Sequence, residues 1–384
     1  MSNSKEHVHI KTLHEQRAKN DKNSSTLAQT LETTIFTPFK SDHKFIFELL
    51  QNADDASDRK ETEANIILKR SLNNRDYLIF SHSGRHFTEQ DVEKICDNSQ
   101  QHFQDKLIST KKIGYKGIGF KSVFSIADCV HIISDNYNFR FDQNYFSEKN
   151  KGGFSYPWPI IPIQNDESSL MPDIKSFVRK EHVTFILQIR SGMRIESEMQ
   201  FIKENRNLML FLKNVSKISL LDNLSSTNIS VQAVGNVKKF FINNLFVDSW
   251  LMEEVVFDIP QEASEFLKSL QDSECPQRLK AAVQTKIIFS AQITTEDKII
   301  PIAKGQPFCY LPTQVNCGFP FFVNADFLLN SERSRIIDNR WNAFLMSYVG
   351  YGQLMFLAEL TKHEEYHSQI FKLLHEQYSG PLIY

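Results

Sequence analysis

Three polar residues share one side of a predicted apolar helix. They lie in F-E-L-L-Q-N-A-D-D-A, residues 47–56. Because a helix turns by about 100° per residue, Glu48, Asn52 and Asp55 fall within roughly 60° of one another. The Asn52 amide oxygen can bind a hard divalent ion such as Mg²⁺, and the carboxylate one turn before it can orient or deprotonate a water. The alternative is a solvated helix face with an i,i+4 pair, and the helix alone does not decide between the two.

A glycine-rich segment, I-G-Y-K-G-I-G-F-K-S-V-F, lies at residues 113–124. Gly114, Gly117 and Gly119 allow the backbone to approach a ligand closely. A helix is expected directly after them, and the free N–H groups at its start favour a phosphate. Residues 105–121 hold five lysines and one aspartate, which gives a local positive field. The alternative is a glycine-rich turn that begins a helix.

Two better-known phosphate motifs do not fit this segment. In a P-loop the lysine directly follows the second glycine, whereas Phe120 separates that glycine from Lys121 here, and no apolar strand leads into the segment. A dinucleotide-binding fingerprint would have glycine where this chain has Ser122. Close backbone approach and a helix start therefore remain the indications of an anion site.

The periodicity of the surrounding sequence predicts the elements that position these residues. Apolar residues recur at helical spacing over 45–53, with Ser41 or Asp42 available as the N-cap. Thr88 begins a second helix with Asp91 at the capping-box position. A further helix is expected at 120–128, and strands at 64–70, 76–82, 129–134, 137–142 and 182–190. Elements in this order predict an α+β fold, a two-layer α/β sandwich with a mostly antiparallel sheet.

The 384 residues are enough for two or three domains. We assign residues 1–40 to an N-terminal polar or helical segment and 41–195 to a first domain. Residues 205–340 form a second α+β domain, and 341–384 a C-terminal helical segment. The polar residues 191–206 are interpreted as the linker.

The composition narrows the class of protein. Hydrophobic residues make up 41% and charged residues 23%, the balance of a soluble globular protein. A formal net charge of −2 gives no global field to attract nucleic acid or an anionic membrane. The five cysteines form no C-x-x-C pair, which argues against a disulfide framework or zinc ribbon. With no signal peptide and no apolar run able to span a bilayer, we expect a cytoplasmic protein without membrane contacts.

His7, His9 and His14 lie close together near the N-terminus and are a weak indication of a metal site. No carboxylate or thiol is spaced along the sequence to complete their ligand set. A solvated polar segment is the preferred interpretation.

Together, the helix with Glu48 and Asn52, the strand before Gly84 and the distal G-x-x-G-x-G-F resemble the three ATP-binding motifs of the GHKL superfamily in order and spacing. This superfamily includes heat-shock chaperones, MutL, gyrase and histidine kinases. More narrowly, N-A-D-D-A, the glycine-rich segment and G-F-P-F-F-V-N-A-D-F-L-L-N-S-E-R-S resemble the sacsin and NO VEIN branch of heat-shock-chaperone-like ATPases. The resemblance extends over residues 40–345 and implies a GHKL (Bergerat) sandwich for residues 41–195.

The resemblance also implies a role for each matching residue. Glu48 would be the general base for the attacking water, and Asn52 would hold the Mg²⁺ ion that bridges the phosphates of ATP. Asp55 would line the nucleotide pocket and Gly84 would contact the adenine side, while residues 98–112 would form a mobile lid. The other nucleotide-binding positions are the phosphate loop and one residue of a later strand, namely Gly114, Tyr115, Lys116, Gly117, Ile118, Gly119, Phe120 and Thr184.

One position departs from the superfamily pattern. Most members have an aspartate two residues before the glycine now at Gly84, where it accepts a hydrogen bond from the adenine amino group; this chain has His82. A neutral imidazole nitrogen can accept such a bond, so adenine binding remains compatible, with weaker affinity or base selectivity. The alternative is a hydrogen-bonded histidine at a strand end.

A basic residue of the adjacent domain often reaches the terminal phosphate in this superfamily. Arg333 and Arg335 are the candidates here, because arginine suits bidentate phosphate contacts and stabilises developing charge. Surface salt bridges are the alternative. Histidine kinases typically have asparagine at the position of Glu48, so the resemblance favours an ATPase over a protein kinase.

We therefore expect an ATP-binding and ATP-hydrolysing conformational switch, chaperone-like or a sensor or effector module of a larger assembly such as a defence system. Its ligands would be ATP, ADP and Mg²⁺, with a protein partner or client, and a homodimer is compatible with the resemblance. Two alternatives stay open: a nucleotide-binding interaction module with little turnover, and a nucleic-acid-handling GHKL ATPase. The near-neutral charge and the lack of a basic, aromatic-interleaved stripe weigh against nucleic acid.

Overall fold

The chain folds into two compact units in this computed structural model. The structure describes residues 4–36, 44–57, 61–71, 75–97, 120–150, 153–166, 169–193, 195–222, 225–272, 274–330 and 334–374. Within these ranges, unit 1 comprises the parts of Met1–Leu107, Lys116–Glu204 and Lys213–Thr227, and unit 2 the parts of Asn205–Leu212 and Asn228–Tyr384. Each unit is an α+β structure with a mixed sheet, and each is described by itself.

Unit 1 is organised around a sheet with the strand order β7-β1-β2-β6-β3-β4-β5. Neighbouring strands are antiparallel except for β1 and β7, which are parallel. The strands are β1 (Thr62–Arg70), β2 (Asp76–His82), β3 (Ala127–Ser134), β4 (Tyr137–Asp142), β5 (Ile163–Gln164), β6 (Val183–Ile189) and β7 (Val215–Leu221). The five predicted strands are thus confirmed, and β6 completes their sheet as expected.

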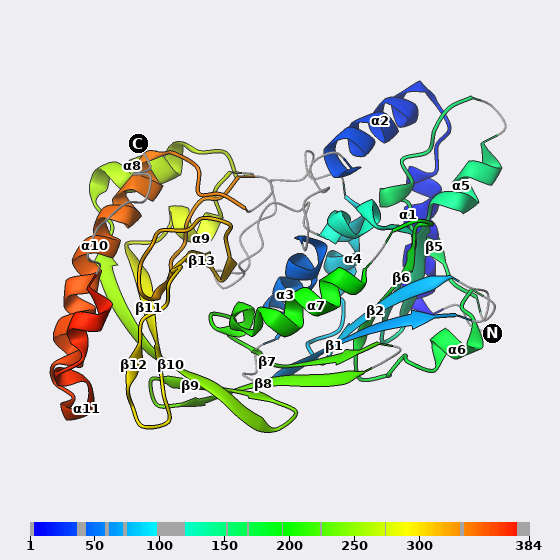
Figure 1. Ribbon diagram of the computed structural model, residues 1–384. Helices are drawn as coiled ribbons and strands as arrows, with labels where there is room; N and C mark the ends of the chain where they lie inside the picture. The colour runs from blue at the N-terminus through cyan, green and yellow to red at the C-terminus, as the bar shows by residue number, and fades with distance from the viewer. Residues whose placement is uncertain are drawn as a thin grey trace. The chain divides into compact units, whose positions relative to one another are not determined.

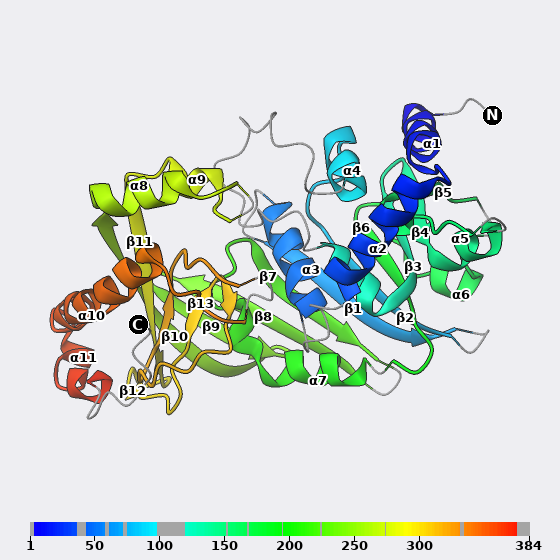
Figure 2. The same ribbon diagram turned by 90° about the horizontal axis from the view of Figure 1, so that it is seen from above.

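The helices of unit 1 lie on both faces of this sheet. They are α1 (Lys5–Arg17), α2 (Lys22–Phe36), α3 (Lys44–Asp55), α4 (Glu89–Cys96), α5 (Gln143–Lys149), α6 (Pro172–Lys175) and α7 (Glu196–Glu204), with 3-10 helices η2 (Phe120–Ser125) and η3 (Trp158–Ile160). Helix α3 lies against β1 and β7 and beside η2 (Figures 1 and 2). On the other face, Ile174 of α6 packs with Tyr77, Ile79 and Ile186. Since alternate residues of a strand face opposite ways, the even-numbered residues of β2 face η2 and α3.

Unit 2 contains the strand order β14-β13-β15-β11-β10-β9-β8, with β12 paired to β11. Its strands are β8 (Ser226–Val234, from Asn228 on), β9 (Val237–Ile242), β10 (Leu245–Asp258), β11 (Gln284–Ile293), β12 (Ile299–Ile300), β13 (Pro307–Cys309), β14 (Leu311–Pro312) and β15 (Phe322–Asn324). Its helices are η4 (Arg206–Met209), α8 (Gln261–Ser269), α9 (Gln277–Lys280), α10 (Arg340–Leu360), α11 (Glu364–His367) and η5 (Ile370–Leu373). Helices α8 and α10 lie against each other, and α10 lies on β10 and β11.

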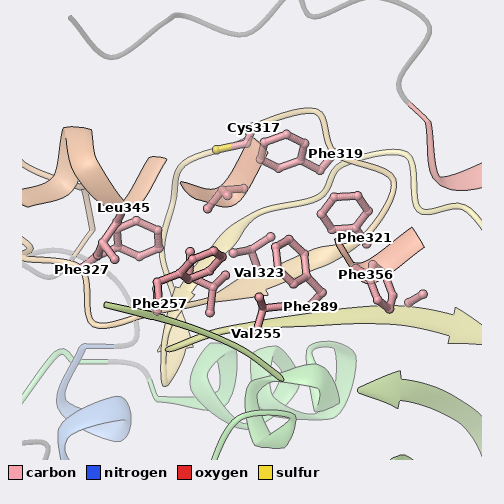
Figure 3. Close-up of a cluster of buried hydrophobic side chains, with 14 of the residues drawn as sticks. Val255, Phe257, Phe289, Cys317, Phe319, Phe321, Val323, Phe327, Leu345 and Phe356 are labelled. Atoms are coloured by element: carbon pink, nitrogen blue, oxygen red, sulfur yellow. The ribbon is translucent and has the colours of Figure 1, made fainter. Parts of the chain in front are cut away.

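The core of unit 2 is built from aromatic rings, as the 31 phenylalanines of the chain suggest. Figure 3 shows Phe257, Phe289, Phe321 and Phe356 converging between the strands and α10. The rings of Phe289 and Phe356 stack with centroids 5.5 Å apart. Gly352 makes this packing possible, because a Cβ atom there would lie 2.8 Å from the Phe289 ring. The Phe289 ring therefore fills the space beside Gly352 of α10.

The structure corrects two sequence assignments in the region of the predicted linker. Residues 191–206 are not simply a linker, since they contain α7, whose Met199 and Ile202 are buried. The three-residue spacing of Met199 and Ile202 places both side chains on one helix face and indicates a helix. The polar composition of the segment led instead to its interpretation as a linker. Residues 215–221 fall within the predicted second domain, 205–340, but they form β7, which pairs with β1 in unit 1. The chain thus leaves unit 1 at Glu204 and returns to it at Lys213.

Local helix signals had mixed outcomes. Helix α4 has the predicted capping box, with the Thr88 hydroxyl accepting from Asp91 N and the Asp91 carboxylate accepting from Thr88 N. The expected helix at 120–128 is wrong in type and length, because Phe120–Ser125 is a 3-10 helix and β3 begins at Ala127. The N-caps proposed for α3, Ser41 and Asp42, lie outside the described residues.

Two further expectations concern cysteines and membranes. All five cysteines are free, and four of them are buried. Across the described ranges, none of the helices combines the length and apolarity needed to cross a bilayer.

Candidate functional site

The helix α3 carries the first part of the site. Its apolar face is fully buried through Ile46, Leu49, Leu50 and Ala53. Glu48, Asn52 and Asp55 all lie on this continuous helix, so their predicted angular relation holds. Glu48 is only 5% exposed, whereas Asn52 and Asp55 are partly exposed. No residue described by the structure forms a hydrogen bond with the Asn52 carboxamide, so both ends of this amide are available to a ligand.

The end of α3 is fixed to the turn that follows β2. Asn52 O accepts a hydrogen bond from Ala56 N at 2.9 Å, and Ala56 O accepts one from Arg85 N at 2.8 Å. Gly84 is buried in this turn, and a Cβ atom there would lie 3.1 Å from Ala56 O and 2.9 Å from His82 Nδ1. Glycine at position 84 is therefore required by the close approach of α3. The structure thereby brings Asn52 and the His82–Gly84 turn together, as the sequence predicts for one site.

His82 is buried, with 1% of its surface exposed. Burial lowers its pKa to about 3, and the nearby His182, His86 and Arg85 add to the shift, so the imidazole is neutral at pH 7. Its Nδ1 accepts a hydrogen bond from Gly84 N at 3.1 Å. A neutral imidazole carries one proton, so that proton is on Nε2. The nitrogen able to accept is therefore already used, and the one left for a ligand is a donor.

Aromatic rings surround His82 on the same face of the sheet. The rings of Phe185 and His82 stack with centroids 6.3 Å apart, and Phe80 lies at the same distance from His82. Phe120, the first residue of η2, is 5.6 Å from Phe185. Phe87 is 6.0 Å from Phe185. The predicted residues His82 and Phe120 are thus joined by one aromatic wall.

Thr184 does not belong to this wall. In the register of β2 and β6, Thr184 lies opposite Ser81, whereas Val183 lies opposite His82. Directly paired residues face the same way and successive residues face opposite ways, so Thr184 is on the other face of the sheet from His82. The side chain is fully buried there. The predicted water-mediated contact of Thr184 with a base is therefore wrong, because the residue of β6 that faces the same way as His82 is Val183.

Most of the glycine-rich segment, namely Gly114, Tyr115, Lys116, Gly117, Ile118 and Gly119, lies outside the described residues, as does the lid at 98–112. The described end of the segment includes Lys121, which is buried. Its ammonium group donates to the backbone carbonyl of Asp97, and burial lowers its pKa to about 8. Of the five lysines assigned to the local positive field, Lys121 is thus directed to the end of α4.

The sequence analysis missed the role of Asp54. This residue is 1% exposed, and its carboxylate accepts three backbone N–H bonds, from Lys213 at 3.1 Å, Asn214 at 2.7 Å and Val215 at 2.9 Å. It therefore ties the end of α3 to the start of β7. One signal was present, because Asp54 lies only about 40° from Leu50 on the helix, and a charge beside the buried face must be paired.

We expect Asp54→Ala to lower the free energy of unfolding by about 3 kcal/mol, since three backbone N–H groups, all at least partly buried, would lose their acceptor. Urea denaturation monitored by tryptophan fluorescence measures this change. Asp55→Ala is the matched control, because Asp55 is partly exposed on the same turn of helix. Equal losses of stability in the two variants would show that Asp54 has no special structural role.

The two candidate arginines belong to the part of the sequence assigned to unit 2. Arg333 lies outside the described residues. Arg335 is exposed and forms no ion pair with any residue that the structure describes. Its backbone N–H donates to Asn330 Oδ1 at 3.1 Å. A role of either arginine at a terminal phosphate stays a prediction.

Comparisons with known proteins find a family match at residues 25–190 and similarity over most of the chain. Residues 25–190 match the family model described as the Sacsin domain. The chain is 25% identical to Protein NO VEIN of Arabidopsis thaliana over 347 residues, which cover 85% of this chain and 12% of that protein. It is 23% identical to human (Homo sapiens) Sacsin over 388 residues, covering 82% of this chain and 8% of Sacsin. The chain thus spans a small part of these relatives, and it is similar to NO VEIN and to Sacsin over most of its own length, with a match to the Sacsin domain model at residues 25–190.

Proposed function

We propose that unit 1 binds and hydrolyses Mg²⁺-ATP in the manner of the GHKL superfamily, with the Bergerat type of α/β sandwich. The observation that carries this proposal is the pairing on α3 of buried Glu48 with Asn52, one turn away, whose carboxamide has no hydrogen-bond partner among the described residues. The same helix end is held against the His82–Gly84 turn. The carboxylate of Glu48 and the amide oxygen of Asn52, close to the turn at Gly84, are oxygen ligands of the kind that hold a Mg²⁺ ion with a bound anion.

The residues present fit a magnesium nucleotide. Asn52 offers an amide oxygen, a ligand type that Mg²⁺ accepts, and Gly84 lets the residue that follows α3 approach the turn after β2 closely. A bound Mg²⁺ ion would neutralise charge on the phosphates. Glu48, in its buried position, would orient a water and take its proton. Asp55 would line the pocket from the last turn of α3.

The hydrogen bond from Gly84 N to His82 Nδ1 determines which group of a purine base His82 could bind. A donor at Nε2 matches an acceptor on the base, such as N1 of adenine or O6 of guanine, and does not match the adenine amino group. We therefore propose ATP as the substrate with weak discrimination against other purine nucleotides.

The wider function that we propose is a conformational switch. Closure of residues 98–112 over the phosphates and a contact from Arg333 or Arg335 would couple hydrolysis to unit 2. Because the relatives are much longer, we propose a chaperone-like or sensor module within a larger assembly, acting on a protein partner. The sequence-based expectations of a homodimer and of a cytoplasmic location stay predictions.

Two measurements on the purified chain test this function. Titration calorimetry with Mg²⁺-ATP measures binding, and steady-state phosphate release measures turnover. Binding with release supports an ATPase. Binding without release supports the nucleotide-gated interaction module instead. If no nucleotide binds at millimolar concentration, the proposed site is wrong.

His82→Asp is expected to raise the preference for ATP over GTP by about tenfold, because the new carboxylate can accept from the adenine amino group and repels guanine O6. The ratio of the two dissociation constants, measured by calorimetry, reports this change. His182→Asp is the control, since His182 is also a buried histidine near the strand end. A wild-type protein that already rejects GTP strongly, with no gain in the variant, contradicts the assignment of Nε2 as a donor to the base.

A further inference from the structure

A second cluster of ligand-type side chains lies away from α3, between α1 and α4. It consists of His9, Glu89 and Glu93. Their ligand atoms all lie within 4.8 Å of one another, and His9 Nε2 is 3.9 Å from Glu89 Oε1 and 3.7 Å from Glu93 Oε1. Glu89 and Glu93 are four residues apart on α4, so their carboxylates share one face of that helix.

His9 is oriented toward this cluster by its own environment. Its Nδ1 is 3.1 Å from the Tyr137 hydroxyl of β4, which leaves Nε2 for a ligand. The His9 side chain is 11% exposed, and Nε2 is buried without a hydrogen-bond partner in the described ranges. A buried ring nitrogen left without such a bond is unusual, because burial of an unsatisfied polar atom is unfavourable. A metal ion at this point would satisfy it.

We propose that His9, Glu89 and Glu93 bind a divalent transition-metal ion, with Zn²⁺ as the best fit. Imidazole with carboxylates is a donor set that Zn²⁺ accepts, whereas Mg²⁺ prefers oxygen ligands alone. Tetrahedral zinc with bonds near 2.0–2.1 Å separates its ligands by about 3.4 Å. The observed nitrogen–oxygen separations of 3.7 and 3.9 Å are therefore close to a metal-bound arrangement, and small rotations of the half-exposed glutamates suffice.

The neighbouring groups are compatible with an ion at this site. Lys5 Nζ is 3.5 Å from Glu89 Oε2, the oxygen other than the one facing His9. Lys5 is 83% exposed, so it can move into solvent when the ion binds. The Tyr137 oxygen can accept the Nδ1 proton of a His9 ligated through Nε2, the usual outer-shell arrangement for a metal-bound histidine. Three protein ligands leave one position for water or another ligand. The ion would fasten α1 to α4.

Calorimetric titration of EDTA-stripped, tag-free protein with ZnCl₂ tests this proposal. We expect one ion per chain in the presence of millimolar Mg²⁺, a rise of the thermal unfolding midpoint, and at least a tenfold loss of affinity in His9→Ala and Glu93→Gln. Glu93 is half exposed, so Glu93→Gln should fold normally. Tyr137→Phe should weaken binding by about tenfold or more through the lost outer-shell bond.

The control is His7→Ala, on the same helix but outside the cluster, which should leave zinc affinity unchanged. If the wild type binds no zinc below about 1 mM, or if Glu93→Gln binds as tightly as the wild type, the cluster is only a set of surface contacts between His9 and two glutamates. These outcomes do not depend on nucleotide binding at α3.

Discussion

Glu48→Ala is expected to lower phosphate release from Mg²⁺-ATP by about 100- to 10,000-fold, the usual contribution of a positioned general base. The carboxylate is 5% exposed on α3, where little bulk water can replace it as a proton acceptor. Nucleotide affinity should change little, because a general base acts mainly in the transition state. Steady-state phosphate release and calorimetric binding of the same variant measure the two effects separately.

Two further variants sharpen the Glu48 experiment. Glu48→Gln keeps the shape of the side chain but cannot take a proton, so it should lose turnover as Glu48→Ala does. Glu15→Gln alters an exposed glutamate of α1 and should leave turnover unchanged. If Glu48→Gln retains wild-type turnover, Glu48 is not the base and the hydrolytic mechanism proposed for α3 is wrong.

Asn52→Ala should remove most Mg²⁺-dependent nucleotide binding, with a loss of affinity on the order of 10- to 100-fold or more, because a ligand of the ion and its charge-assisted contacts would be lost. Asn52 makes no side-chain hydrogen bond among the residues described, so the substitution should have little effect on stability. Calorimetric titration with ATP in Mg²⁺ and in EDTA measures the metal-dependent part directly.

The comparison of the two buffers identifies the role of Asn52. The wild type should bind ATP more tightly in Mg²⁺ than in EDTA, and Asn52→Ala should show little difference between the two. Asn136→Ala, in the exposed turn between β3 and β4, is the control and should behave as the wild type. If Mg²⁺ raises the ATP affinity of Asn52→Ala by the same factor as that of the wild type, the ion has other ligands.

Local sequence patterns were sufficient to predict the elements around the site. The 3.6-residue periodicity identified α3, short apolar runs identified β1 and β2, and the Thr88 capping box identified the start of α4. Each of these signals depends on residues a few positions apart, which is why sequence alone contains them. The same holds for Glu48, Asn52 and Asp55, whose common side is a property of any helix at this position.

Other features depended on contacts between distant segments. Asp54 and Asp55 are adjacent in N-A-D-D-A, but only the return of the chain at Lys213–Val215 makes Asp54 a buried anchor. The strand register, not composition, placed Thr184 on the face away from His82. The proton on His82 Nε2 follows from a hydrogen bond across the Gly84 turn.

The N-terminal histidines show the same division most clearly. Sequence spacing offered them no carboxylate partner, whereas the fold brings Glu89 and Glu93, 80 or more positions along the chain, to His9. The sequence by itself determined α3, α4 and the strands β1, β2, β3, β4 and β6, the residue types on α3 and the similarity to the Sacsin domain. The tertiary structure alone decided which polar groups became anchors, donors or candidate ligands, because hydrogen bonding, burial and metal coordination depend on distance in space and not on separation along the chain.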